Sequence, residues 1–283
     1  MHIMQNPTFL IIDSGVGGLS IWHEIQQRIP HAHACYVADN GAYPYGALAE
    51  QVLVERLLSL LPELEQRYQP DIIVIACNTA STVVLDHLRA QISTPIIGVV
   101  PAIKPAAELS VSRQVTLLAT PGTIKRQYTD RLIQEFGKGC AFTRIGSHEL
   151  VHEAERKLRG LPVNMDTIRQ ELAPLIQPNN NTDVLILGCT HFPFLKDEIS
   201  QLIPAGIRVI DSGNAIARRA QQLLDNLAAT TGHETHLTTN TFLFTAESGE
   251  AHNLEPGILH FGFDKIQFLT KSTTQNEQKS GAS

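Results

Sequence analysis

The sequence of 283 residues lacks the marks of a membrane or secreted protein. No apolar run approaches the roughly 18 residues that cross a bilayer. The first residues, MHIMQNP, lack the charged and apolar regions of a signal peptide. We therefore expect a cytoplasmic protein without a membrane partner.

Basic and aromatic residues are also few. Lysine and arginine number 22 against 28 aspartates and glutamates, for a formal net charge of −6, and aromatics make up 6%. No basic run could neutralise a row of phosphates, so nucleic acid is not an expected partner. Hydrophobic residues make up 43% of the chain, which is enough for a substantial core without disulphides or metals.

Cysteine is scarce. Cys35, Cys77, Cys140 and Cys189 are far apart in the sequence and form no Cys-x-x-Cys pair. Closely spaced cysteines mark disulphide frameworks and zinc sites. We therefore expect four reduced thiols.

Short β-branched runs alternate with helical patterns through most of the chain, which predicts an α/β fold with mostly parallel sheets. Amphipathic spacing predicts helices over 19–29 and 124–136. Several of the expected strands are apolar on both faces, as buried parallel strands must be. The eight expected strands lie at residues 9–12, 33–38, 72–76, 95–100, 115–119, 141–145, 184–188 and 207–210.

Two segments are echoed within the chain. DIIVIACNT at 71–79 is matched by DVLILGCTH at 183–191, and FLIIDSG at 9–15 is matched by IRVIDSG at 207–213. Such echoes predict that equivalent strand ends lie opposite each other. Ligands of open α/β sheets bind outside the carboxyl ends of strands, so we expect the site there.

The echoes suggest how the chain is divided. We expect a first domain over 1–98 that resumes at 205–270, and a second domain over 99–204. Within 230–270, only the run TFLFT is predicted to form a strand. The last residues, 271–283, carry nothing that could form a core and are predicted to be disordered.

Cys77 and Cys189 share one context. Each ends an apolar strand and precedes polar residues, Asn78 after the first and Thr190 after the second. Backbone amides at a helix start favour an anion, so we expect them to lower the thiol pKa. Two facing thiols can invert a stereocentre, because one removes a proton while the other delivers one to the opposite face.

Other readings of these residues stay open. A lone buried cysteine is more often a core thiol, and Cys35 and Cys140 keep that interpretation. The loop DSGVGGLS at 13–20 could hold a carboxylate or phosphate or only form a tight turn. It is neither a dinucleotide fingerprint nor a P-loop. Asp13 could be a helix cap or a site carboxylate, and the turn at 43–46 could merely punctuate the chain.

A rival motif lies at 148–152, which reads HELVH. It matches the HExxH signature of zinc peptidases, and Glu171 lies where a third ligand could come. The alternative is a short solvated helix with His148, His152 and Glu155 on one side.

Several motifs occur in one order between Phe9 and Leu224, and through them the chain resembles the cofactor-independent aspartate/glutamate racemase family, in its glutamate branch. The resemblance implies two similar α/β domains related by pseudo-symmetry, with the active site between them. It also implies interconversion of L- and D-glutamate for peptidoglycan synthesis without pyridoxal phosphate or metal, and allows a homodimer. The motifs are DSGVGG, DNGAY followed by PYG, ACNTAS, VVPAIKPA, LLATPGT, GCTHFP and the returning DSG.

The resemblance also assigns residues. Cys77 would take the α proton from D-glutamate and Cys189 from L-glutamate, with Asp13 and His191 assisting. An assisting glutamate falls on Glu155, with Glu153 as the alternative, because HELVH departs from the family wording. Substrate contacts would come from Asp13, Ser14, Tyr45, Gly46, Asn78, Thr79, Thr190 and His191.

Three functions therefore stand at this point: a racemase, a zinc hydrolase using HELVH, and a noncatalytic module that binds a small anion.

Overall fold

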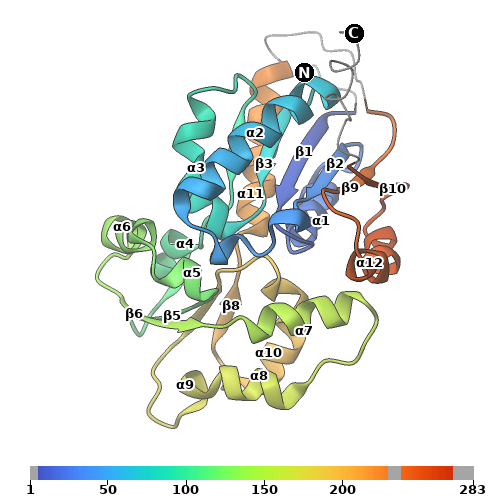
Figure 1. The fold of residues 1–283 in the computed structure, drawn as a ribbon. Helices are drawn as coiled ribbons and strands as arrows, with labels where there is room; N and C mark the ends of the chain where they lie inside the picture. The colour runs from blue at the N-terminus through green and yellow to red at the C-terminus, as the bar shows by residue number, and fades with distance from the viewer. Residues whose placement is uncertain (1–5, 229–236, 270–283) are drawn as a thin grey trace, which may run out of the picture.

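The computed structural model describes residues 6–228 and 237–269, so the predicted disorder of 271–283 lies outside the described residues (Figure 1). Two sheets, in which every pairing is parallel, form the centres of two stacked α/β units. The first sheet has the order β10-β9-β2-β1-β3-β4 and the second β6-β5-β7-β8. The predicted α/β fold with mostly parallel sheets is thus confirmed.

All eight strands expected before residue 211 are present, as β1 to β8, and TFLFT forms β9. The first sheet contains β1 (Thr8–Asp13), β2 (His33–Ala38), β3 (Ile72–Ile75), β4 (Ile96–Gly98), β9 (Thr241–Phe244) and β10 (Lys265–Phe268). The second contains β5 (Gln114–Ala119), β6 (Ala141–Gly146), β7 (Val184–Leu187) and β8 (Arg208–Ile210).

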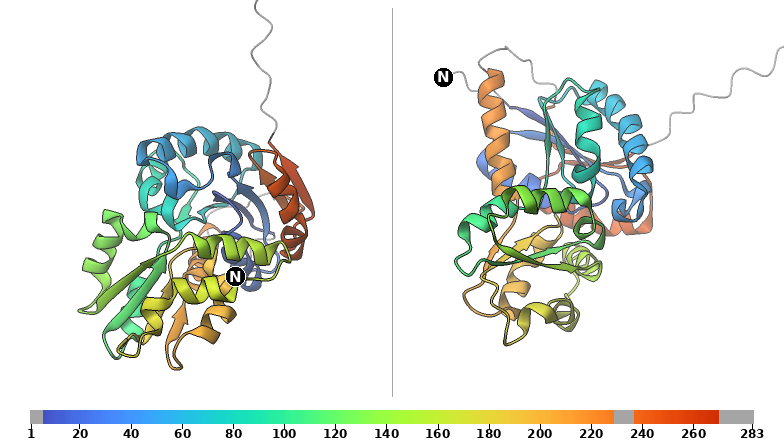
Figure 2. Two further views of the ribbon diagram at one scale, coloured as in Figure 1. Left: turned by 60° about the horizontal axis from the view of Figure 1, so that its bottom comes forward. Right: turned by 90° about the vertical axis from the view of Figure 1, so that its left-hand side faces the viewer.

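Alternating side chains of the first sheet pack on opposite helix layers. Phe9 and Ile11 join a core with α1 (Leu19–Arg28) and α11 (Gly213–Ala228). Leu10 and Ile12 join a second core beneath α2 (Glu50–Tyr68) and α3 (Asn78–Arg89) on the other face (Figure 2). Because strand side chains alternate, burial on both faces requires the continuous apolar runs seen in the sequence.

The second sheet is also covered on both faces. One layer holds α4 (Ile103–Leu109), α5 (Pro121–Ile124) and α6 (Gln127–Phe136). The other holds α7 (Glu149–Leu158), α8 (Met165–Glu171), α9 (Ala173–Ile176) and α10 (Lys196–Leu202). The described residues also include the short 3₁₀ helices η1 (Asn40–Ala42), η2 (Tyr45–Ala47) and η3 (Phe192–Leu195).

The single helix predicted over 124–136 is wrong, because α5 and α6 are separate. Arg126 has extended backbone angles at the break. The Thr129 hydroxyl donates to the Thr123 carbonyl across it at 2.7 Å. A side chain thus satisfies a carbonyl that a continuous helix would have bonded to a backbone amide.

The echo between 71–79 and 183–191 reflects equivalent positions. Strand orders β2-β1-β3-β4 and β6-β5-β7-β8 correspond. Asp71, before β3, accepts from the amide of Thr8 at 2.7 Å, and Asp183, before β7, accepts from the amide of Ser112 at 2.9 Å. Each carboxylate therefore fixes the start of the neighbouring central strand.

The DSG echo does not mark equivalent strands. β1 is central in its sheet and corresponds to β5, whereas β8 is an edge strand that corresponds to β4. β8 also pairs with β7, so part of the segment 205–270 lies in the second sheet. The chain returns to the first unit only after Ile210, through α11, which packs on α1.

Beyond β9, the chain forms α12 (Gly249–His260) and β10, neither of which was expected. β9 pairs with β2, and β10 pairs with β9 at the sheet edge. Within residues 6–228 and 237–269, no helix combines the length and apolar character needed to span a bilayer.

Candidate active site

A cavity of about 440 Å³ lies between the two units, at the carboxyl ends of their strands. Both Cys77 and Cys189 line it. Apart from Glu155 and its alternative Glu153, every residue that the resemblance assigned to the racemase site lines this cavity: Asp13, Ser14, Tyr45, Gly46, Cys77, Asn78, Thr79, Cys189, Thr190 and His191. Glu155 contacts the cavity residue His191.

The two thiols occupy equivalent places in the two sheets. Cys77 lies two residues beyond β3, and Cys189 two residues beyond β7. The amide before each cysteine donates to the neighbouring central strand, from Ala76 to Ile12 at 2.8 Å and from Gly188 to Leu118 at 2.7 Å. The same hydrogen-bond pattern at the end of each strand therefore places one thiol on each side of the shared cavity.

Cys77 is the residue before the first turn of α3, and its side chain is buried. Burial and the nearby negative charge of Asp13 raise the pKa of the Cys77 thiol well above its usual value. The Ala80 amide opposes this rise but contributes less. The expectation that the helix start lowers this pKa is wrong, because desolvation and a neighbouring carboxylate outweigh one amide.

Asp13 ends β1 and is held by its own loop. Its Oδ1 accepts from the Ser14 amide at 2.6 Å and its Oδ2 from the Gly18 amide at 2.8 Å. The amides of this glycine loop thus bind a carboxylate of the chain itself. Burial raises the pKa of Asp13, although His191 and these two amides act against the rise.

Gly17 allows the loop to approach the second unit. A Cβ at this position would lie 2.4 Å from the His191 ring nitrogen Nδ1 and 2.7 Å from the Thr190 hydroxyl. Next to it, the Ser20 hydroxyl donates to the Thr190 carbonyl at 2.7 Å. The start of α1 therefore contacts the segment after β7 directly.

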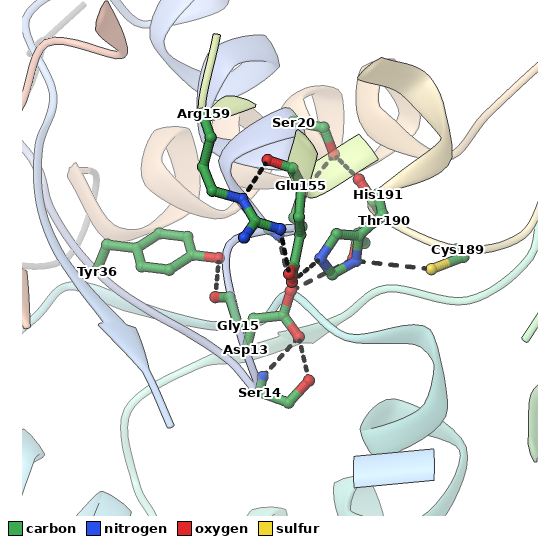
Figure 3. Close-up of polar contacts among 12 residues, drawn as sticks. Asp13, Ser14, Gly15, Ser20, Tyr36, Glu155, Arg159, Cys189, Thr190 and His191 are labelled. Carbon is green, nitrogen blue, oxygen red and sulfur yellow. Dashed lines mark hydrogen bonds and ion pairs between the residues drawn. The ribbon is translucent and has the colours of Figure 1, made fainter. Parts of the chain in front are cut away.

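A chain of polar contacts leads away from Cys189 (Figure 3). Its Sγ lies 3.8 Å from His191 Nδ1, and His191 Nε2 lies 3.3 Å from Glu155 Oε1. Arg159 approaches the other carboxylate oxygen of Glu155 at 3.9 Å. The second thiol thus has an imidazole and a carboxylate behind it.

This chain of contacts favours a charged histidine. Burial alone would lower the pKa of His191, but hydrogen bonding to Cys189 and Glu155 raises it well above its usual value. Burial would raise the pKa of Glu155, yet the bond from His191 lowers it. The charged His191 places a positive charge beside Cys189, whose Sγ lies 3.8 Å from the ring nitrogen Nδ1.

The structure separates the two glutamates that the sequence left open. Glu153 is buried on another side of α7, where its Oε2 accepts from the Asn164 amide at 2.7 Å. Only Glu155 of the two contacts His191.

Neutral donors complete the wall. The side-chain nitrogen Nδ2 of buried Asn78 has no hydrogen-bond partner in the part of the chain that the structure describes. The Thr79 hydroxyl lies 3.3 Å from that of Thr120 and 3.1 Å from that of Thr123. Sequence reasoning missed Thr120 and Thr123 as site residues, although both lie in the LLATPGT motif.

His148 and His152 of HELVH also line the cavity. Across residues 6–228 and 237–269, no three or more His, Cys, Asp and Glu side chains are placed to hold a metal ion. The zinc-peptidase interpretation therefore gains no support from the geometry.

We expect Asp13→Asn to speed alkylation of Cys77. Loss of the charge lowers the pKa of the thiol. Each unit by which the thiol pKa falls gives about tenfold more thiolate at neutral pH. Nucleophilicity falls about threefold for the same change, so labelling should rise roughly threefold for each unit by which the pKa falls. Iodoacetamide labelling with peptide mapping across pH measures this effect.

Two controls accompany that experiment. Ser14→Ala keeps the Asp13 charge and should not speed labelling. Cys35 should stay unlabelled throughout, because burial raises its pKa to about 12. Slower labelling of Cys77 in Asp13→Asn would show that the carboxylate does not oppose the thiolate.

Comparisons with known proteins agree with the resemblance. The family described as Asp/Glu/Hydantoin racemase matches residues 20–220. Glutamate racemase of Klebsiella pneumoniae (strain 342) is 45% identical over 263 residues, which cover 93% of this chain and 92% of that protein.

Solved structures are similar as well. The Escherichia coli glutamate racemase, crystallised with L-glutamate and the activator UDP-MurNAc-ala, aligns with a TM-score of 0.89 at 42% identity, covering 94% of this chain and 98% of that one. The Thermus thermophilus glutamate racemase in complex with beta-chloro-D-alanine aligns with a TM-score of 0.74 at 27% identity, with the same coverage. The chain therefore belongs to the Asp/Glu/hydantoin racemase family and, within it, to the glutamate racemases.

Proposed function

We propose that this chain interconverts L- and D-glutamate with Cys77 and Cys189 as the two acid/base groups. The observation that carries the proposal is the arrival of both thiols at one cavity from equivalent strand ends. A protease nucleophile would use one thiol and would leave the second unexplained.

The proton transfers balance without a cofactor. The Cys189 thiolate takes the α proton of L-glutamate, and the electron pair left on the α carbon takes a proton from the Cys77 thiol on the opposite face. D-glutamate leaves with Cys77 as thiolate and Cys189 as thiol, and the reverse reaction exchanges the roles. The high pKa of Cys77 suits a thiol that starts as the acid for L-glutamate.

The wall around the thiols suits a dicarboxylate. Developing charge on the α carbon and its carboxylate needs fixed donors in a water-poor site. Asn78 Nδ2, which has no partner among the described residues, and the Thr79 hydroxyl provide such donors. The Thr190 hydroxyl lines the same cavity and donates to Asp13 Oδ2 at 3.4 Å. The L-glutamate bound by the E. coli relative supports the same substrate here.

D-glutamate is a building block of peptidoglycan, so we infer that the chain supplies cell-wall synthesis. A cytoplasmic location and a homodimer remain predictions. Size-exclusion chromatography with light scattering tests the homodimer.

Exchange of the α proton tests the proposal. In D₂O, proton NMR should show loss of the α-proton signal from each glutamate enantiomer, because both thiols exchange with solvent between turnovers. Prior treatment with a metal chelator should change the rate by less than about twofold, since no step uses a metal.

The alternatives give different results. A noncatalytic anion-binding module would bind glutamate and exchange no α proton. A zinc-dependent enzyme would lose activity with the chelator and regain it with added zinc. Either outcome would overturn the two-thiol proposal.

A further inference from the structure

No residue of the segment from Leu237 to Leu269 lines the cavity. It adds β9 and β10 to the edge of the first sheet and places α12 over the end of α7, which belongs to the second unit (Figure 2). The segment 237–269 therefore contacts both of the α/β units between which the cavity lies.

The contact between α12 and α7 is unusually close at one point. A Cβ on Gly257 would lie 2.3 Å from the carbonyl oxygen of Leu158 and 3.1 Å from its carbonyl carbon. These are backbone atoms, so no side-chain rotation could make room. Leu158 is the last residue of α7, and its side chain packs against the core of the first unit. Gly257 thus lets the end of α7 seat directly on the first unit.

The seated end of α7 carries the carboxylate behind Cys189. Glu155 lies three residues before Leu158, and its carbonyl accepts from the Arg159 amide at 3.0 Å and from Arg159 Nε at 3.1 Å. The Glu155 carboxylate lies 3.3 Å from His191 Nε2. A shift of this last turn would move Glu155 relative to His191.

We propose that Gly257 is a positioning residue for the catalytic machinery: by admitting the Leu158 carbonyl, it seats the last turn of α7 so that Glu155 meets His191 behind Cys189. This inference rests on the proposed function and extends it to the C-terminal segment. It predicts an effect on one face of the substrate only, because nothing in the contact between Gly257 and Leu158 involves Cys77.

Gly257→Ala tests the proposal, with Gly249→Ala as the matched control in the same helix. A Cβ at Gly249 meets nothing within 4 Å. Both changes raise helix propensity, so lost propensity cannot explain a defect in Gly257→Ala. The probe is 3-chloroglutamate, which loses chloride once its α proton is removed, and each enantiomer reports on one thiol.

In Gly257→Ala, we expect elimination from the L form to fall at least tenfold while the D form stays within about twofold of the unmodified protein. Gly249→Ala should match the unmodified protein with both forms. Racemisation rates alone would not separate the faces, because an equilibrium constant of one forces equal specificity constants in both directions.

An unchanged rate, or an equal loss for both enantiomers, would overturn the proposal. If Gly257→Ala fails to fold, Leu158→Ala replaces it, since it removes the packing of the α7 end without a backbone clash; the same loss confined to the L form is then expected, and any other result counts against the idea. Failure of the proposed function is recognised separately, because the unmodified protein would then exchange no α proton in D₂O.

Discussion

Cys77→Ser should keep elimination of chloride from the L form of 3-chloroglutamate and lose it from the D form, and Cys189→Ser should do the reverse. A serine hydroxyl ionises far less readily than a thiol, so the substituted face loses its base while the other face still abstracts. Racemisation needs both faces and should fall by roughly a thousandfold or more in each variant.

Chloride release and α-proton NMR, run on both enantiomers, measure these rates. Cys35→Ser is the control, because Cys35 is buried within β2 and does not line the cavity. If both cavity variants eliminated the same enantiomer, the thiols could not act on opposite faces, and a one-base mechanism would have to replace this one.

The expectation of opposite faces has its root in the fold. Cys77 and Cys189 follow equivalent strands. The backbone amide of the residue before each cysteine donates an equivalent hydrogen bond to the central strand. Two related sheets that meet at their carboxyl ends present such positions to one cavity from two sides. The near repetition of ACNT and GCTH therefore encodes geometry as well as chemistry.

Much of this arrangement could be predicted because buried parallel strands leave a strong local signal. The run HACYVA forms β2 over the same residues that were predicted, since five of its six residues are buried. By contrast, β10 is an edge strand whose residues alternate between exposed and half-buried, and α12 contains Pro256 and Gly257. The alternation in β10 lasts only four residues, and a proline and a glycine inside α12 argue against a helix there, so the sequence signal of both elements is weak.

The site was harder to predict where it depends on contacts distant in sequence. The helix start at Cys77 suggested a lowered pKa, but the carboxylate that helps to raise it comes from β1. The choice between Glu153 and Glu155 likewise depends on His191, which follows β7. Local spacing could not supply either partner.

Glu155→Gln should slow elimination from the L form by roughly a hundredfold and leave the D form nearly unchanged. Glutamine keeps the shape of the side chain but removes the charge that helps to hold His191 protonated. With less imidazolium, the positive charge 3.8 Å from the Cys189 Sγ is lost, next to the group that removes the α proton of L-glutamate in the proposed mechanism. The rate of chloride release from each enantiomer of 3-chloroglutamate, measured across a range of pH, checks this expectation.

The variant should also change how elimination from the L form depends on pH. Glu155 raises the pKa of His191, so the histidine stays charged until pH rises through that raised value. In Glu155→Gln the pKa of His191 falls, and the alkaline loss of L-form elimination should move to lower pH. The D form depends on Cys77, which His191 reaches only through Asp13, so its pH profile should shift less than that of the L form.

Glu153→Gln is the matched control for this experiment. Glu153 is a buried glutamate of the same helix, but its carboxylate accepts from the Asn164 amide and does not contact His191. The Glu153→Gln variant loses a buried charge and should be less stable than the unmodified protein. Its pH profile of elimination from L-3-chloroglutamate should nevertheless keep the shape of the unmodified protein's profile. If Glu153→Gln moved the alkaline limb and Glu155→Gln did not, the carboxylate that tunes His191 would have to be reassigned, and the positioning role of Gly257 would lose its target.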